Sequence, residues 1–159
     1  MSNDVEDNGL HFPAERNGRT AMLLALAGFI PVAVLSVWLA AISPDHPWHG
    51  NTIFLLKTYA ALILAFLGGI RWGLATRDDD DRTPRLLAFS TIPQLVGWGA
   101  LALPDMYAFA LLAAAFAAHG AWDQFAVHNA QAPDWFGKLR MRLTMLVTAA
   151  MIVAMIAVA

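Results

Sequence analysis

The sequence predicts an all-α integral membrane bundle of five transmembrane helices, with its N-terminus inside and its C-terminus outside. Composition is the first observation, because 58% of the 159 residues are hydrophobic and only 14% are charged, which is typical of membrane proteins. The second is that the charges gather in an N-terminal tail and two loops, and leave long apolar runs almost clean. The third is the length of those runs, since about 20 apolar residues in a helix cross a hydrocarbon core. We therefore expect a polar tail, residues 1–20, and one membrane domain, residues 21–159.

The five expected spans are separated by short polar connections. They cover about residues 21–42, 52–76, 86–103, 106–128 and 139–159. Pro31 lies in the middle of the first span, where a membrane helix can kink if its neighbours satisfy the freed carbonyl. Pro93 interrupts the third span in the same way. Only Pro104 and Asp105 separate the third span from the fourth, so these two should form an antiparallel hairpin. The polar tail lacks the apolar region of a secretory signal.

The orientation follows from the basic residues, because cytoplasmic loops are enriched in lysine and arginine. Eight of the ten basic residues fall on one side of a five-span chain: Arg16, Arg19, Arg77, Arg82, Arg85, Lys138, Arg140 and Arg142. The opposite connections, residues 43–51 and 104–105, contain none. We therefore predict that the N-terminus is inside. The same distribution argues against a nucleic-acid partner, which would need a basic stripe on a solvated surface.

Small residues at every fourth position predict where helices pack closely. In the second span this ridge consists of Ala61, Ala65, Gly69 and Gly73. A second ridge in the fourth span consists of Ala110, Ala114 and Ala118. We expect the two ridges to face each other inside the bundle.

Polar residues within the spans are the candidates for a site. They are Arg71, Trp72, Gln94, Trp98, His119, Asp123 and Arg140. Because the second and fourth spans run in the same direction, Arg71 and Asp123 should lie near the same membrane surface as Arg140. Asp123 could then pair with Arg71 or with Arg140, which would offset the cost of an ionised carboxylate in the membrane. His119 is four residues from Asp123 and shares its helix face.

Three interpretations of these residues stay open. They could be structural anchors, with Asp123 in a salt bridge and Arg71 reaching the headgroups. They could line a pocket open to the inner side that binds an anionic headgroup, a metabolite or a quinone. Acid–base catalysis is the third, although no nucleophile with a nearby base is evident. His46 and His49 could supply two metal ligands, but without cysteine or a carboxylate cluster we expect a solvated loop and no metal.

Four blocks of the sequence carry a family resemblance. They are YAALILAFLGGIRWGLA (59–75), IPQLVGWGAL (92–101), WDQ (122–124) and PDWFGKLRMRLT (133–144). In these blocks, in this order and spacing, the chain resembles the DUF3429 family of multi-pass membrane proteins, which are transmembrane protein 69-like. The resemblance implies a five-helix inner-membrane protein of bacteria or mitochondria whose biochemical activity is not established.

From these features we expect a protein that acts without catalysis as an accessory, assembly or scaffold component. It would lie in the bacterial inner (cytoplasmic) membrane, or in the mitochondrial inner membrane if the protein is eukaryotic. The alternative is a small-molecule or lipid binder or transporter with a polar pocket near the cytoplasmic side. We expect no cofactor, the lipid bilayer as surroundings, and a membrane protein or a second copy of the chain as candidate partners.

Overall fold

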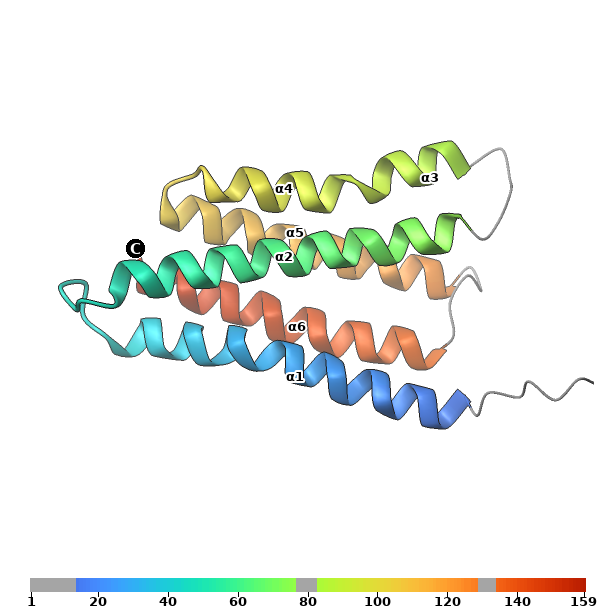
Figure 1. Ribbon diagram of the computed structural model, residues 1–159, viewed down its shortest axis with the longest axis horizontal. Helices are drawn as coiled ribbons and strands as arrows, with labels where there is room; N and C mark the ends of the chain where they lie inside the picture. The colour runs from blue at the N-terminus through green and yellow to red at the C-terminus, as the bar shows by residue number, and fades with distance from the viewer. Residues whose placement is uncertain (1–13, 77–82, 129–133) are drawn as a thin grey trace, which may run out of the picture.

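The chain folds into an elongated bundle of helices that lie side by side (Figure 1). The structure, a computed structural model, describes residues 14–76, 83–128 and 134–159. Within these ranges there are six helices and no strand: α1 (Ala14–Ala41), α2 (His49–Ala75), α3 (Thr83–Ser90), α4 (Ile92–Leu101), α5 (Asp105–His128) and α6 (Asp134–Ala157). The predicted all-helical bundle is thereby confirmed. The start of α1 and the C-terminus lie at opposite ends of the bundle (Figure 1).

The expected third span is a rod made of two helices, α3 and α4, rather than one continuous helix. Pro93 lies in the first turn of α4, where its missing N–H breaks no helical hydrogen bond. At the end of α3, Ser90 Oγ donates to the carbonyl of Leu87, and the carbonyl of Ala88 accepts from both the hydroxyl and the backbone N–H of Thr91. Pro31, in contrast, lies inside the continuous helix α1.

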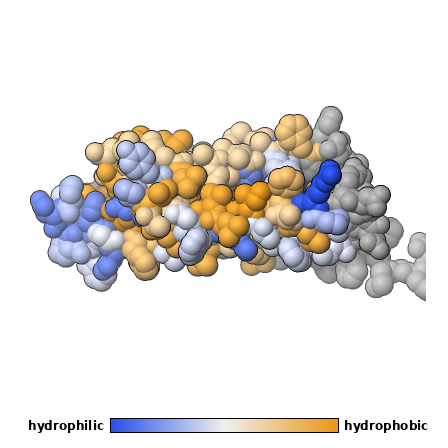
Figure 2. All heavy atoms as spheres, turned by 90° about the horizontal axis from the view of Figure 1, so that it is seen from above, coloured by the Kyte–Doolittle hydropathy of each residue, from blue (hydrophilic) through white to orange (hydrophobic). Residues whose placement is uncertain are grey.

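Three helical segments of the described residues are long and apolar enough to cross a membrane: Arg19–Ala41, His49–Ala75 and Gly137–Ala157. Helices α3 and α4 are short individually, with 8 and 10 residues. Helix α5 is long enough, with 24 residues, but its hydropathy is lowered by Asp105, His119 and Asp123. Figure 2 shows hydrophobic residues across the middle of one face and hydrophilic residues towards both ends. Such an apolar outer surface would be unfavourable in water and suits a lipid environment.

The core lies between α1, α2, α5 and α6. Its largest fully buried apolar side chains are Leu39, Leu56, Leu64, Phe109, Leu112 and Met151. The α3 and α4 rod packs against α2 through small residues. A Cβ atom added at Gly68 would lie 2.5 Å from the carbonyl oxygen of Ser90, and one at Gly97 would lie 3.0 Å from Cα of Ala61. Glycine at these two positions therefore permits the close approach of the helices.

The predicted small-residue ridges do not coincide with the buried faces. Ala61 is buried against Gly97, but Gly69 and Gly73 are exposed and would have no neighbour within 4 Å of an added Cβ. The reason is geometric: at 3.6 residues per turn, the twelve residues from Ala61 to Gly73 turn the face by about 120°. Packing at Gly69 and Gly73 stays a prediction, and it can concern only a surface outside the bundle.

The prediction that the second ridge faces the inside of the bundle is also wrong. Its three alanines, Ala110, Ala114 and Ala118, are all exposed. The buried face of α5 instead contains Ala108, Phe109, Leu112, Ala113 and Phe116. Because residues 108–118 of α5 are apolar at every position, composition alone does not distinguish the core face from the lipid face there.

Candidate functional site

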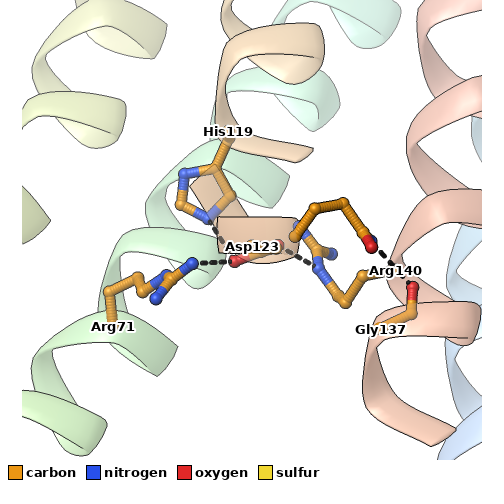
Figure 3. Close-up of polar contacts among 6 residues, drawn as sticks. Arg71, His119, Asp123, Gly137 and Arg140 are labelled. Carbon is orange, nitrogen blue, oxygen red and sulfur yellow. Dashed lines mark hydrogen bonds and ion pairs between the residues drawn. The ribbon is translucent and has the colours of Figure 1, made fainter. Parts of the chain in front are cut away.

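The carboxylate of Asp123 is the centre of a buried ionic cluster (Figure 3). Asp123 lies on α5 and is only 2% exposed. Arg71 of α2 donates a hydrogen bond from Nη2 to Oδ1 at 2.7 Å, and Arg140 of α6 donates from Nε to Oδ2 at 2.5 Å. Both carboxylate oxygens are therefore bound by guanidinium groups from other helices. Where the sequence indicated one partner or the other, the structure has both.

The helix directions bring these three residues together. Helices α2 and α5 run in the same direction, and α6 begins at the end of the bundle where both of them end (Figure 1). Arg71, Asp123 and Arg140 each lie four to six residues from that end of their helix. At 1.5 Å per residue this is a depth of about 6–9 Å, so the three side chains meet at one level. The cluster thereby ties α2, α5 and α6 together.

The cluster has more positive than negative charge. Arg71 and Arg140 are 9% and 7% exposed, so both guanidinium groups are largely removed from solvent. Charge-assisted hydrogen bonds to one carboxylate offset part of the desolvation cost of these ions. The three side chains together have a formal charge of +1. In addition, Nε of Arg71 is buried and has no hydrogen-bond partner among the described residues.

An aromatic ring, that of Trp122, lies against the guanidinium group of Arg71. The Cζ atom of Arg71 lies 4.8 Å from the centroid of the Trp122 ring, which is a cation–π distance. The ring of Trp122 is also 5.7 Å from the ring of His119 and 6.5 Å from that of Phe89, both in an edge-on arrangement. His119 Nε2 lies 3.9 Å from Asp123 Oδ1, which is too long for a hydrogen bond.

Two further contacts hold α5 against α6 beside the cluster. Gln124 Nε2 donates to the carbonyl of Gly137 at 3.0 Å. Gly120 packs directly against the side chain of Thr144, leaving no room for a Cβ atom. Neither Gln124 nor Gly120 was among the sequence candidates. Their position in the sequence could have identified both residues, because Gly120 lies three residues before Asp123 and Gln124 lies directly after it.

Three of the seven candidate residues do not join the cluster. Trp72 is 48% exposed and Trp98 is 74% exposed, and Gln94 is also exposed. Trp72 follows Arg71 and therefore points about 100° away around α2. Gln94 and Trp98 are four residues apart on the outer face of α4, whose inner face consists of Pro93, Gly97 and Ala100. The structure thus assembles Arg71, His119, Asp123 and Arg140, and leaves the other three at the outer surface.

His46, in the loop before α2, and His49, the first residue of α2, both lie at the opposite end of the bundle from the ionic cluster. His46 Nδ1 accepts a hydrogen bond from the Trp48 backbone N–H at 3.2 Å, and its ring packs edge-on against Trp38. The described residues contain no group of three side chains that could hold a metal ion. Its hydrogen bond with Trp48 and its ring contact with Trp38 give His46 a role in shaping the loop.

The ionic hydrogen bonds of this cluster serve mainly to join helices. Both oxygens of the Asp123 carboxylate accept charge-assisted hydrogen bonds from arginines of other helices, which can hold the three helices at a fixed distance. The three side chains together can also present net positive charge to a neighbouring anion.

An all-helical bundle with an apolar outer surface, three helices long and apolar enough to cross a membrane and a buried ionic centre defines a helical multi-pass membrane protein. The chain belongs to the DUF3429 family of proteins of unknown function, whose family model matches residues 17–156. The family resemblance of the four sequence blocks is thereby confirmed.

The chain is similar to transmembrane protein 69 of two vertebrates. It is 31% identical to the protein of Xenopus tropicalis over 128 residues, which cover 79% of this chain and 49% of that relative. It is 28% identical to the protein of Mus musculus over 145 residues, which cover 87% of this chain and 56% of that relative. The chain thus spans about half the length of the curated relatives it matches. No solved structure matches the chain.

Proposed function

We propose that the protein is a non-catalytic accessory, assembly or scaffold component that crosses its membrane five times. The observation that carries this proposal is the use of Asp123, the only buried acidic side chain among the residues whose burial the structure describes. Both of its oxygens are bound to arginines of other helices, so the polar centre is occupied in joining α2, α5 and α6. A site for catalysis or transport would need polar groups free to meet a substrate.

The helix lengths support five crossings. The rod formed by α3 and α4 covers residues 83–101, which is about 28 Å at 1.5 Å per residue. Helix α5 has 24 residues, and a span needs about 20. Since both are packed in line with the three apolar spans, the membrane that contains those three would also contain α5 and this rod.

The charges support an N-terminus on the cytoplasmic side. Arg19, Arg85, Lys138 and Arg142 are exposed, and each lies in the half of its helix nearer the end of the bundle where α1 begins. At the opposite end Lys57 is buried and donates to Asp105 and to the carbonyl of Leu103, so a carboxylate neutralises it. The exposed positive charge is therefore on one side, which would be cytoplasmic under the positive-inside rule. The assignment to an inner membrane, bacterial or mitochondrial, rests on the family resemblance.

The experiment is a mild-detergent purification of the protein at native expression level, followed by mass spectrometry of co-purifying proteins. We expect one membrane protein to be retained in a fixed stoichiometric ratio. Recovery of the chain without any protein partner, either as a monomer or with a turnover activity of its own, would contradict the accessory role.

The alternative function, a binder or transporter with a polar pocket near the cytoplasmic side, has less support. It requires the seven candidate side chains to converge on one cavity. Gln94, Trp98 and Trp72 are exposed on the outer surface instead. A transport activity lost in Asp123→Asn, in protein that still folds, would nevertheless favour this alternative.

A further inference from the structure

An open groove of about 550 Å³ runs along the bundle between α1, α2 and α6. Its volume lies within the range of about 300–1,000 Å³ that is typical of ligand sites. The walls are almost entirely apolar, and include Ala25 and Gly28 of α1, Phe66 and Ile70 of α2, and Leu143 of α6. Because these helices cross the membrane, the groove opens towards the hydrocarbon region.

The two ends of the groove differ in character. On α2 the lining runs from Ile70 back to Tyr59, which is about 16 Å along the helix axis. At the Tyr59 end, the hydroxyl of Tyr59 donates to the carbonyl of Gly28 at 2.9 Å and joins α1 to α2. At the Ile70 end, the wall contains Arg140. The groove is therefore long and apolar, with a cation at its end nearest the membrane surface.

Arg140 belongs to a cluster with unbalanced charge. Arg71 and Arg140 share the single carboxylate of Asp123, so the three have a formal charge of +1. Nε of Arg71 also lacks a hydrogen-bond partner among the described residues. Net charge is costly inside a membrane, and an anion placed beside Arg140 would lower that cost.

We propose that the groove binds one acyl chain of an anionic phospholipid, with the phosphate group beside Arg140. A lipid of this kind has the two features that the groove would recognise, a long apolar chain and an anion at one end. A partner helix would fill the apolar part equally well, but it would need an acidic residue at the level of Arg140, and such residues are rare in membrane spans. This proposal concerns a site of this chain and does not depend on the accessory role.

The test is native mass spectrometry of the full chain after reconstitution in vesicles of mixed phosphatidylcholine and phosphatidylglycerol. Ala25→Phe places a ring in the groove without touching the ionic cluster. Ala27→Phe is the matched control, because Ala27 is an exposed residue of the same helix outside the groove lining. We expect one phospholipid to be retained by the wild type and by Ala27→Phe, and at least a tenfold loss of it in Ala25→Phe.

The headgroup preference tests the role of the charge. One net cation near the membrane surface should enrich the retained lipid in phosphatidylglycerol about fivefold over phosphatidylcholine. This measurement uses the wild type and so does not depend on a variant that fails to fold. In Arg140→Gln, where Arg71 and Asp123 balance each other, the enrichment should disappear.

The location is checked with phosphatidylglycerol that has a photoactivatable group in its acyl chain. We expect cross-links to groove residues such as Phe66 and Leu143. Equal lipid retention in the two phenylalanine variants, no headgroup preference in the wild type, or cross-links confined to other faces would each overturn the proposal. So would protection of these residues by a helix of a second protein.

Discussion

Oδ1 of Asp123 on α5 lies 2.7 Å from Nη2 of Arg71 on α2, although the two residues are 52 positions apart in the chain. The other oxygen of Asp123 is bound by Arg140 of α6. Removing the carboxylate would leave two buried guanidinium groups without their counter-ion, whereas removing one arginine would leave the carboxylate with the other. The aspartate is therefore the most sensitive member of the cluster.

Asp123→Asn should destabilise the fold strongly. Breaking a buried ion pair by removing one partner typically costs about 3–5 kcal/mol, because an uncompensated buried charge is left behind. Unfolding in detergent, followed by circular dichroism against temperature or denaturant, measures the change. Asp45→Asn is the control, because Asp45 is exposed in the loop between α1 and α2 and should have little effect. Similar midpoints for the two variants would show that the cluster does not hold the helices together.

Replacing the whole cluster with apolar side chains should be far less harmful than the single change. In the triple variant Arg71→Met, Asp123→Leu, Arg140→Met no buried charge is left unpaired. Such replacements are neutral or stabilise by about 1–4 kcal/mol in other proteins. The same unfolding measurement checks this, and co-purification shows whether the protein partner is retained. A triple variant as unstable as Asp123→Asn would mean that packing around these side chains, rather than charge, decides stability.

Gly120→Ala should destabilise the bundle, although alanine normally favours a helix over glycine. The added Cβ would overlap the side chain of Thr144 and push α5 away from α6, at a cost of about 1–3 kcal/mol. Gly73→Ala is the matched control, because an added Cβ there has no neighbour within 4 Å. It should stabilise α2 by about 0.5–1 kcal/mol. A lower thermal midpoint for Gly120→Ala and a higher one for Gly73→Ala, each relative to the wild type, would establish the contact. Higher midpoints for both variants would contradict it.

Single-cysteine labelling tests the orientation, and the chain is well suited to it because it contains no cysteine. Ser43→Cys lies in the connection between α1 and α2, and Lys138→Cys lies in the first turns of α6; both positions are exposed. A membrane-impermeant maleimide added to intact cells should label Ser43→Cys. It should label Lys138→Cys only after permeabilisation. The reverse pattern would place the N-terminus outside. Labelling of both positions in intact cells would contradict the three crossings proposed between Ser43 and Lys138.

Much of the architecture could be predicted from the sequence, because membrane insertion depends on local features. Runs of about 20 apolar residues predict helices wherever they occur, since every backbone polar group in the hydrocarbon region must be hydrogen-bonded within its own segment. The pairing of Asp123 could be predicted for a similar reason, because a lone carboxylate at that depth is too costly. The family could be recognised from four blocks whose residues include both Arg71 and Asp123.

The tertiary structure alone decided which face of each helix is buried. In a membrane both the core and the lipid are apolar, so hydrophobic periodicity does not separate the two faces, and Gly69, Trp98 and Ala114 could not be placed by it. The break between α3 and α4 falls directly before Pro93, where the Ser90 and Thr91 hydroxyls donate to backbone carbonyls of α3. That both arginines bind one aspartate depended on the relative placement of three helices. The groove beside Arg140 arises from the same placement, because it exists only where α1, α2 and α6 leave space between them.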